Sequence, residues 1–256
     1  MKNNKLLLFL RYLTPLFCLA GIIYLQTSHI QTKQSQTGED ALKEEQSTQV
    51  FLNLQKNMPS FGFNNLIADW NFLGFIQYFG DGKARKQTGY SLIPNFFEIM
   101  VDRDPRFIQA YLQMSTANSI YAGRPDKTVT FMNRVLESVS PKTFPLSIYI
   151  WIYKGVDEIL FLGDLKAARH SYQMASNWAS IQGNEFMANQ TRATAEYLAT
   201  NPDPRKAQVS AWMTILTTTP DQKTQQYTID KIKSLGAEIS VTPEGKLQVI
   251  TPSSWE

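Results

Sequence analysis

Apolar and polar residues follow three patterns along the chain, and the longest of them is helical. Between residues 64 and 235, apolar positions recur three or four residues apart, and prolines fall at the joints between the apolar stretches. Proline can begin a helix at such a joint without the loss of a backbone hydrogen bond. We therefore expect an all-α fold, with helices near 64–80, 91–102, 105–122, 125–139, 144–162, 164–180, 183–200, 204–218 and 221–235.

The last residues follow an alternating pattern. Glu238–Val241 and Lys246–Val249 alternate apolar and polar positions on either side of Thr242-Pro-Glu-Gly245. Alternation of period two around a turn with proline and glycine is typical of a β-hairpin. Two strands alone are only marginally stable, so this hairpin should pack on the preceding helix. We assign residues 236–256 to a C-terminal β-hairpin and tail.

The N-terminal pattern is an apolar run preceded by positive charge. An uncharged stretch extends over Tyr12–Ile30, with its apolar centre at Tyr12–Leu25, and the cations before it are Lys2, Lys5 and Arg11. With the apolar residues before Arg11 included, the run reaches the roughly 20 residues that a bilayer span needs. We predict an uncleaved signal anchor, a transmembrane helix within residues 1–30, and the alternative is a signal peptide that is cleaved before secretion. The positive charges would place the residues after Leu25 on the extracytoplasmic side.

A polar stretch separates this run from the helical part. Residues 31–49 are rich in Thr, Ser, Gln, Glu and Lys, and Leu42 is their only large apolar residue. Such a segment buries too little surface to offset the entropy lost on ordering, so we expect a flexible linker or at most a loose helix. From Val50 the composition becomes aliphatic and aromatic, and residues 50–235 are long enough to form one sizeable core.

Three of the predicted helices end in the same short motif. Each ends with an aromatic residue, a variable residue and a glycine: Tyr78-Phe-Gly80, Tyr121-Ala-Gly123 and Phe161-Leu-Gly163. The glycines are 43 and 40 residues apart, which indicates an internal repeat. After Gly163 the chain continues with Leu165, Ala168, Tyr172 and Ala175. Glycine lets the chain turn sharply, the alanines let a second helix approach the first, and Tyr172 fills the gap between successive pairs.

This order of residues resembles the second half of a tetratricopeptide repeat (TPR). Trp70-Asn-Phe-Leu73-Gly74 is similar to the beginning of the first helix of the same repeat. The longer segment Phe61–Asp81 resembles an opening segment of membrane-anchored TPR-like proteins of bacteria, especially cyanobacteria. The chain departs from the standard repeat in its longer spacing and in Val156, which stands where a small residue is usual.

The resemblance has consequences for architecture and compartment. It implies an α-solenoid of antiparallel helix hairpins over residues 50–235, located in the periplasm or the thylakoid lumen. It also implies packing roles for the residues that carry the repeat pattern: Trp70, Gly80, Gly123, Gly163, Leu165, Ala168, Tyr172 and Ala175.

The resemblance further implies that the chain binds other proteins. Grooves of helical repeats bind extended segments or helices through the inner face of their first helices. In the register of the third repeat that face holds Tyr153 and Asp157, and in the second repeat it holds Gln113 and Ala117. Tyr153 and Asp157 can stack on a peptide and accept its hydrogen bonds, while Gln113 can bond its backbone. The alternative is that the helices of residues 183–235 cover this face and leave these residues buried.

Composition and charge exclude several classes of function. Cys18 is the only cysteine and lies in the apolar run, so the folded part has no disulfide, thiolate zinc site or cysteine nucleophile. His29 and His170 are far apart, and no carboxylate pair or phosphate-binding glycine loop stands out. The net charge of +3 is scattered among both signs, unlike the basic stripe of a nucleic-acid-binding protein. We therefore expect no catalytic residue, no metal and no cofactor.

Together, these observations favour a protein-interaction scaffold rather than an enzyme. The N-terminal helix would tether it to a membrane, and the extracytoplasmic repeats would hold one or more protein partners, for example during assembly of a membrane or envelope complex. The alternative is a non-catalytic accessory subunit of an envelope enzyme or of a polysaccharide-export system.

Overall fold

The computed structural model describes residues 15, 17–27, 38–220, 222–242, 247–252 and 255, which divide between two compact units, Met1–Glu45 and Gln46–Glu256. Residues 17–27 form a helix in the first unit. Within the described residues, no helix combines the length and the apolar character that a membrane span needs. Residues 1–14, 16 and 28–30 of the predicted anchor, and 31–37 of the predicted linker, lie outside the described residues.

Helix α2 (Gly38–Asn57) begins inside the stretch that the sequence analysis assigned to a linker. Its residues include many strong helix formers. From Gln46 onward α2 belongs to the second unit, and its contacts within that unit are partly polar. Leu52 and Gln55 are buried, and the Nζ atom of Lys56 lies 2.8 Å from Oε1 of Glu98. Because the buried side of α2 carries polar residues, hydrophobicity alone did not reveal this helix.

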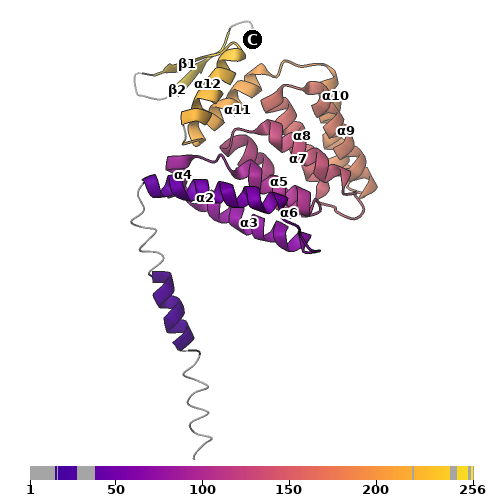
Figure 1. Cartoon of the computed structure of the whole chain (residues 1–256). Helices are drawn as coiled ribbons and strands as arrows, with labels where there is room; N and C mark the ends of the chain where they lie inside the picture. Colours follow the sequence, from indigo (N-terminus) through magenta and orange to yellow (C-terminus); the bar gives the residue numbers. More distant parts are fainter. Residues whose placement is uncertain are drawn as a thin grey trace, which may run out of the picture. The chain divides into compact units, whose positions relative to one another are not determined.

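The second unit consists mostly of helices joined by short turns (Figure 1). These are α3 (Asn64–Gly80), α4 (Gly82–Thr88), α5 (Ile93–Arg103), α6 (Ile108–Tyr111), η1 (Ser115–Tyr121), α7 (Pro125–Glu137), α8 (Ser147–Asp157), η2 (Glu158–Leu162), α9 (Leu165–Ile181), α10 (Glu185–Ala199), α11 (Arg205–Thr218) and α12 (Gln222–Ser234). The mainly helical fold is confirmed. Helix α4 begins where the Asp81 carboxylate accepts a hydrogen bond of 3.1 Å from the backbone N–H of Ala84.

Two of the predicted helices contain a π-helical segment. The helix expected over 105–122 is replaced by the short α6 and by η1, and the helix expected over 144–162 changes from α8 to η2 after Asp157. In a π-helix each backbone N–H bonds to the carbonyl five residues earlier, so one turn takes an additional residue. Each π segment therefore rotates the preceding residues around the helix axis, relative to the positions that an uninterrupted α-helix would give them.

Two helix hairpins are closed by a contact between a glycine and an aromatic ring. A Cβ atom placed on Gly74 of α3 would lie 3.2 Å from Cε1 of Phe96 in α5. A Cβ atom placed on Gly155 of α8 would lie 2.8 Å from Cε2 of Tyr172 in α9. The small residue of the third repeat is thus Gly155, one position before Val156, because η2 intervenes before the turn.

A helix from later in the chain packs against two of the three aromatic-x-Gly turns. Gly123 and Gly163 adopt left-handed backbone conformations, with φ of 63° and 68°. The side chain of Thr224 in α12 packs against Gly123, and Gln208 in α11 packs against Gly163, at distances that leave no space for a Cβ atom. Gly80 differs: it is the last residue of α3 and has no such neighbour within 4 Å. The repeat motif therefore forms a docking point for a C-terminal helix in two places.

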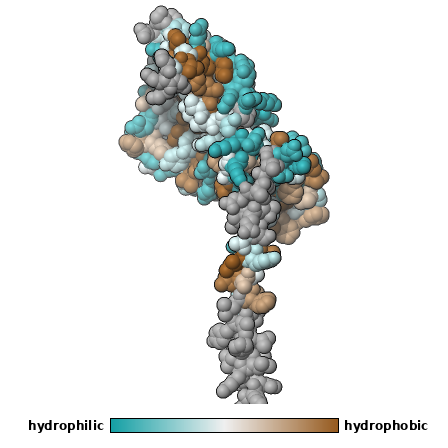
Figure 2. Space-filling model, turned by 90° about the vertical axis from the view of Figure 1, so that its left-hand side faces the viewer, coloured by the Kyte–Doolittle hydropathy of each residue, from teal (hydrophilic) through white to brown (hydrophobic). Residues whose placement is uncertain are grey.

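The predicted β-hairpin is present and packs on the last helices. Strand β1 (Glu238–Val241) pairs antiparallel with β2 (Leu247–Ile250), and Ile239 lies opposite Val249. Both side chains are partly buried against the cluster that contains Trp212. The second strand begins one residue later than predicted, and the predicted turn residues 243–246 lie outside the described residues. Figure 2 shows hydrophobic residues exposed at this end of the unit.

Candidate functional site

The structure separates the residues that were predicted to line one groove. Gln113 and Tyr153 are exposed, whereas Asp157 is completely buried and Ala117 nearly so. The Asp157 carboxylate accepts two hydrogen bonds of 2.7 Å, from Oγ of Ser115 to Oδ1 and from Oγ of Ser119 to Oδ2. The prediction that Asp157 faces a partner is therefore wrong. Its carboxylate instead joins α8 to η1.

The error has a geometric cause. The groove positions were counted back from the turn at Gly163 with the α-helical period, and η2 lies between that turn and Asp157. The additional residue in the π turn displaces every earlier position by one, and one residue corresponds to about 100° around a helix. The same reasoning applies to Ala117, which lies within η1.

Burial changes the acid–base properties of Asp157. The pKa of its carboxyl is raised to about 7, mainly because removal from water disfavours the charged form. The hydrogen bonds from Ser119 and Ser115 lower the pKa, and the nearby Glu158 raises it. A carboxyl group with such a pKa can be a proton donor or acceptor near neutral pH. Here both carboxylate oxygens already have protein partners. The geometry therefore favours a structural, pH-sensitive link between two helices.

A buried ion pair lies one residue further along the chain. The Nζ atom of Lys154 lies 2.6 Å from Oε1 of Glu158 and donates a hydrogen bond of 2.9 Å to Oγ of Ser171. Ser171 in turn donates a hydrogen bond of 2.6 Å to Oε2 of Glu158. Lys154 and Glu158 stand four residues apart on a helix, a spacing that favours pairing of opposite charges, whereas the link to Ser171 has no signal in the sequence. It connects α8 and η2 to α9 and leaves the charges of both side chains satisfied.

A polar groove runs between α9 and α10. Its volume is about 590 Å³, and its lining includes Arg169, His170, Gln173, Asn177, Arg192 and Glu196. All six side chains are exposed. Neither guanidinium forms an ion pair within the described residues, and Arg192 has only a long contact of 3.4 Å with Asn189. No spacing motif marked this groove in the sequence, because its residues come from two helices of different predicted repeats.

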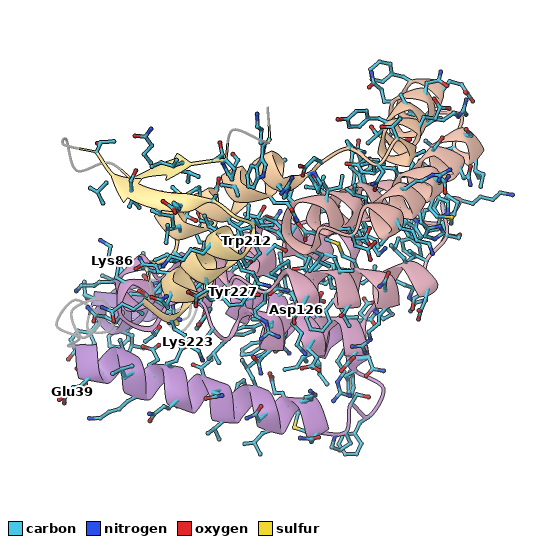
Figure 3. All side chains as sticks on the ribbon, turned by 90° about the horizontal axis from the view of Figure 1, so that it is seen from above. Glu39, Lys86, Asp126, Trp212, Lys223 and Tyr227 are labelled. Atoms are coloured by element: carbon cyan, nitrogen blue, oxygen red, sulfur yellow. The ribbon has the colours of Figure 1, made fainter. Side chains whose placement is uncertain are left out.

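A smaller cleft, of about 340 Å³, separates the beginning of α7 from α12. Figure 3 labels three of the residues that line it, Asp126 of α7 and Lys223 and Tyr227 of α12. The guanidinium of Arg124, which also lines the cleft, holds Asp126 through hydrogen bonds of 2.7 and 2.9 Å and lowers the pKa of its carboxyl. The cleft is therefore lined by one neutralised ion pair and one additional ammonium group.

The outer side of α3 is apolar and exposed. Trp70 was expected in the core of the first repeat, but 61% of its surface is exposed. The same side of α3 exposes three further large apolar residues, Leu66, Leu73 and Ile76. The opposite side packs on α5, where the ring of Phe75 lies 4.9 Å from that of Phe97. The expectation failed because Trp70 needs a preceding helical layer to cover it, and within the described residues this side of α3 has no such layer.

Among the residues that the structure describes, no group of three or more histidine, cysteine, aspartate or glutamate side chains could hold a metal ion. Comparison with family models, with curated proteins and with solved structures finds no match to this chain.

Proposed function

We propose that the chain is a TPR-like scaffold, tethered to a membrane by its N-terminal segment, that holds a protein partner on the extracytoplasmic side. The two glycine–aromatic contacts, Gly74 with Phe96 and Gly155 with Tyr172, support the repeat assignment. Each permits the two helices of a hairpin to approach closely, and the recurrence of this contact in the first and third hairpins fits a chain built from repeats. The cationic residues before the apolar run support the orientation.

The groove between α9 and α10 is the observation that supports a binding function. Arg169 and Arg192 provide planar guanidinium groups that can form paired hydrogen bonds with carboxylates. Gln173 and Asn177 carry amides that can both donate to and accept from a peptide backbone. These groups together fit an extended, acidic segment of a partner protein.

Affinity purification of the full chain from solubilised membranes tests this proposal. The double variant Arg169→Glu with Arg192→Glu should lose a partner that the unmodified chain retains. A matched control is Lys142→Glu with Lys206→Glu, which changes the net charge equally at two exposed positions outside the groove. Retention of the same partner by the groove variant would overturn the proposal, and a glycan-export enzyme as the partner would instead favour the accessory-subunit alternative.

The orientation needs a separate test. A reporter that is active only outside the cytoplasm, fused after Glu256, should be active. An inactive fusion, together with an active cytoplasmic reporter at the same position, would reverse the assignment of the compartment.

A further inference from the structure

We propose that the exposed side of α3 and the turn before it contact a lipid surface. This interaction surface, here called the α3 face, consists of Phe61, Phe63, Leu66, Trp70, Leu73 and Ile76. The inference rests on the membrane tether of the proposed function, but it uses a surface distinct from the α9–α10 groove.

The composition of α3 is the first observation. Asp69 is the only charged residue within Asn64–Gly80, so the helix is apolar on both sides. A helix of this kind is normally buried on all sides, in a protein core or in lipid. Figure 1 shows α3 at an outer edge of the second unit, with α5 on its inner side. One side of α3 is therefore covered by protein. The other side is mostly apolar and uncovered within the described residues, with Asp69 and Gln77 as exposed polar side chains among the apolar ones.

The turn that precedes α3 is the second observation. Phe61 is 84% exposed, and its backbone has a φ of 48°, in the left-handed region that bulky residues rarely adopt. Burial cannot explain this strained conformation, because the ring makes little contact with the protein. A strained backbone at an exposed aromatic residue indicates a functional position. The turn thus extends one aromatic ring outward, and Phe63 exposes a second beside it.

Neighbouring cations fit the headgroup region of a bilayer. Arg103 donates hydrogen bonds from Nη2 to the carbonyl oxygens of Met58, at 2.6 Å, and Gln55, at 3.1 Å, so the end of α5 lies beside the turn. Arg106 follows it: its side chain is 60% exposed, and its Nε atom lies 3.9 Å from Oδ1 of Asp104. Phe and Trp side chains at the apolar boundary with Arg or Lys beside them are the usual composition of a membrane-interface surface.

The position along the chain favours lipid over a second protein. The apolar run Tyr12–Leu25 is followed by only residues 26–37 before α2 begins, and α2 leads directly into the turn at Phe61. If the run is anchored, the α3 face belongs to the folded hairpin nearest to the bilayer in sequence. Hydrogen-bonding groups on this side of α3 are few: the indole N–H of Trp70 and the exposed side chains of Asp69 and Gln77. Most of the exposed area comes from large apolar side chains.

Site-specific fluorescence in vesicles tests this proposal on the full chain. Cys18 is the only cysteine, so a Cys18→Ser background permits a single label at Phe63→Cys or Leu73→Cys. The control is Phe186→Cys at the beginning of α10, an apolar position that is more exposed (77%) than Phe63 (62%) or Leu73 (57%). After reconstitution with phosphatidylcholine and phosphatidylglycerol, an environment-sensitive label at positions 63 and 73 should shift to shorter wavelength and be quenched by spin-labelled lipid. The label at position 186 should do neither.

The possible outcomes distinguish a failure of the lipid contact at the α3 face from a failure of the membrane tether. Flotation of the chain with the vesicles, without quenching at positions 63 and 73, would leave the tether intact and overturn the lipid contact. Failure of the chain to float would overturn both. A blue shift without lipid quenching, together with a disulfide formed between two unlabelled Leu73→Cys chains after addition of an oxidant, would identify a second copy as the occupant and overturn the inference. The triple variant Leu66→Ser, Trp70→Ser and Leu73→Ser should still float but lose the quenching at position 63.

Discussion

The ring of Tyr172 in α9 lies directly against the backbone of Gly155 in α8. This contact sets the distance between the two helices, because any side chain at position 155 would have to occupy the space of the ring. The equivalent contact in the first hairpin is looser by 0.4 Å. A Cβ atom placed on Gly74 would lie 3.2 Å from the ring of Phe96, whereas one placed on Gly155 would lie 2.8 Å from the ring of Tyr172. Close approach of helix backbones at a glycine is therefore a shared feature of two hairpins in the chain.

The contact between Gly155 and Tyr172 predicts that a larger residue at position 155 lowers stability. Gly155→Ala would bring a methyl group to 2.8 Å from Cε2 of Tyr172, and the buried ring has little room to move. We expect a loss of about 1–3 kcal/mol in the free energy of unfolding, as is usual for overpacked cores. Urea denaturation measures it. Gly80→Ala is the control, since nothing lies within 4 Å of that position and its stability should be unchanged or slightly higher.

Much of the fold could be predicted because helical periodicity and turn residues are local signals. The helix beginning at Leu165 and the small residues Ala168 and Ala175, both fully buried, follow from spacing alone. The hairpin near Glu238 likewise follows from alternation and a proline–glycine turn. These features depend on residues within one or two turns of each other.

The failures arise where local counting does not determine the structure. A π segment adds one residue without a sequence signal, so Asp157 was placed on the wrong side of its helix. The exposure of Trp70 depends on whether another layer covers α3, which the repeat pattern does not specify. The groove at Arg169 and Arg192 depends on how two helices pack, and neither helix carries a binding motif of its own.

The buried ion pair provides a second prediction. Lys154→Met would leave the Glu158 carboxylate buried without its cation, and removal of one partner of a buried pair typically costs about 3–5 kcal/mol. The double variant Lys154→Met with Glu158→Met should recover most of that loss, because no charge then remains buried. Urea denaturation of the single and double variants measures the difference. Equal stability of the single variant and the unmodified chain would show that the pair is not closed in solution.

The exposed part of the predicted groove gives a third prediction. Gln113 and Tyr153 remain accessible, and the ring of Tyr153 lies 6.5 Å from that of Tyr149 on the same helix. If a partner extends across this face, Gln113→Ala with Tyr153→Ala should weaken its binding. The melting temperature should change little, because neither residue is buried. Normal binding by this double variant, measured by affinity purification, would restrict the partner to other surfaces such as the α9–α10 groove.

The last prediction concerns the dependence of stability on pH. Asp157 has a pKa near 7 in the folded chain, against 3.8 for a free carboxyl group, mainly because burial disfavours its charged form. Between these two values the folded state binds more protons than the unfolded state. The contribution of the protonated Asp157 carboxyl to the free energy of unfolding is therefore complete below about pH 4 and is lost as the pH rises toward 7.

Asp157→Asn isolates this contribution, because the amide keeps the shape of the side chain but does not titrate. Relative to the unmodified chain, the variant should gain about 3 kcal/mol in the free energy of unfolding between pH 5 and pH 8. Urea denaturation of both proteins at each pH measures this difference, and other titrating groups cancel in the comparison. Ser119→Ala is the control: it removes one hydrogen bond to the carboxylate, which should raise the pKa further and extend the pH-dependent range to higher pH. A difference between Asp157→Asn and the unmodified chain that is constant with pH would show that the carboxyl is ionised throughout this range, and hence more hydrated than its burial between α8 and η1 implies.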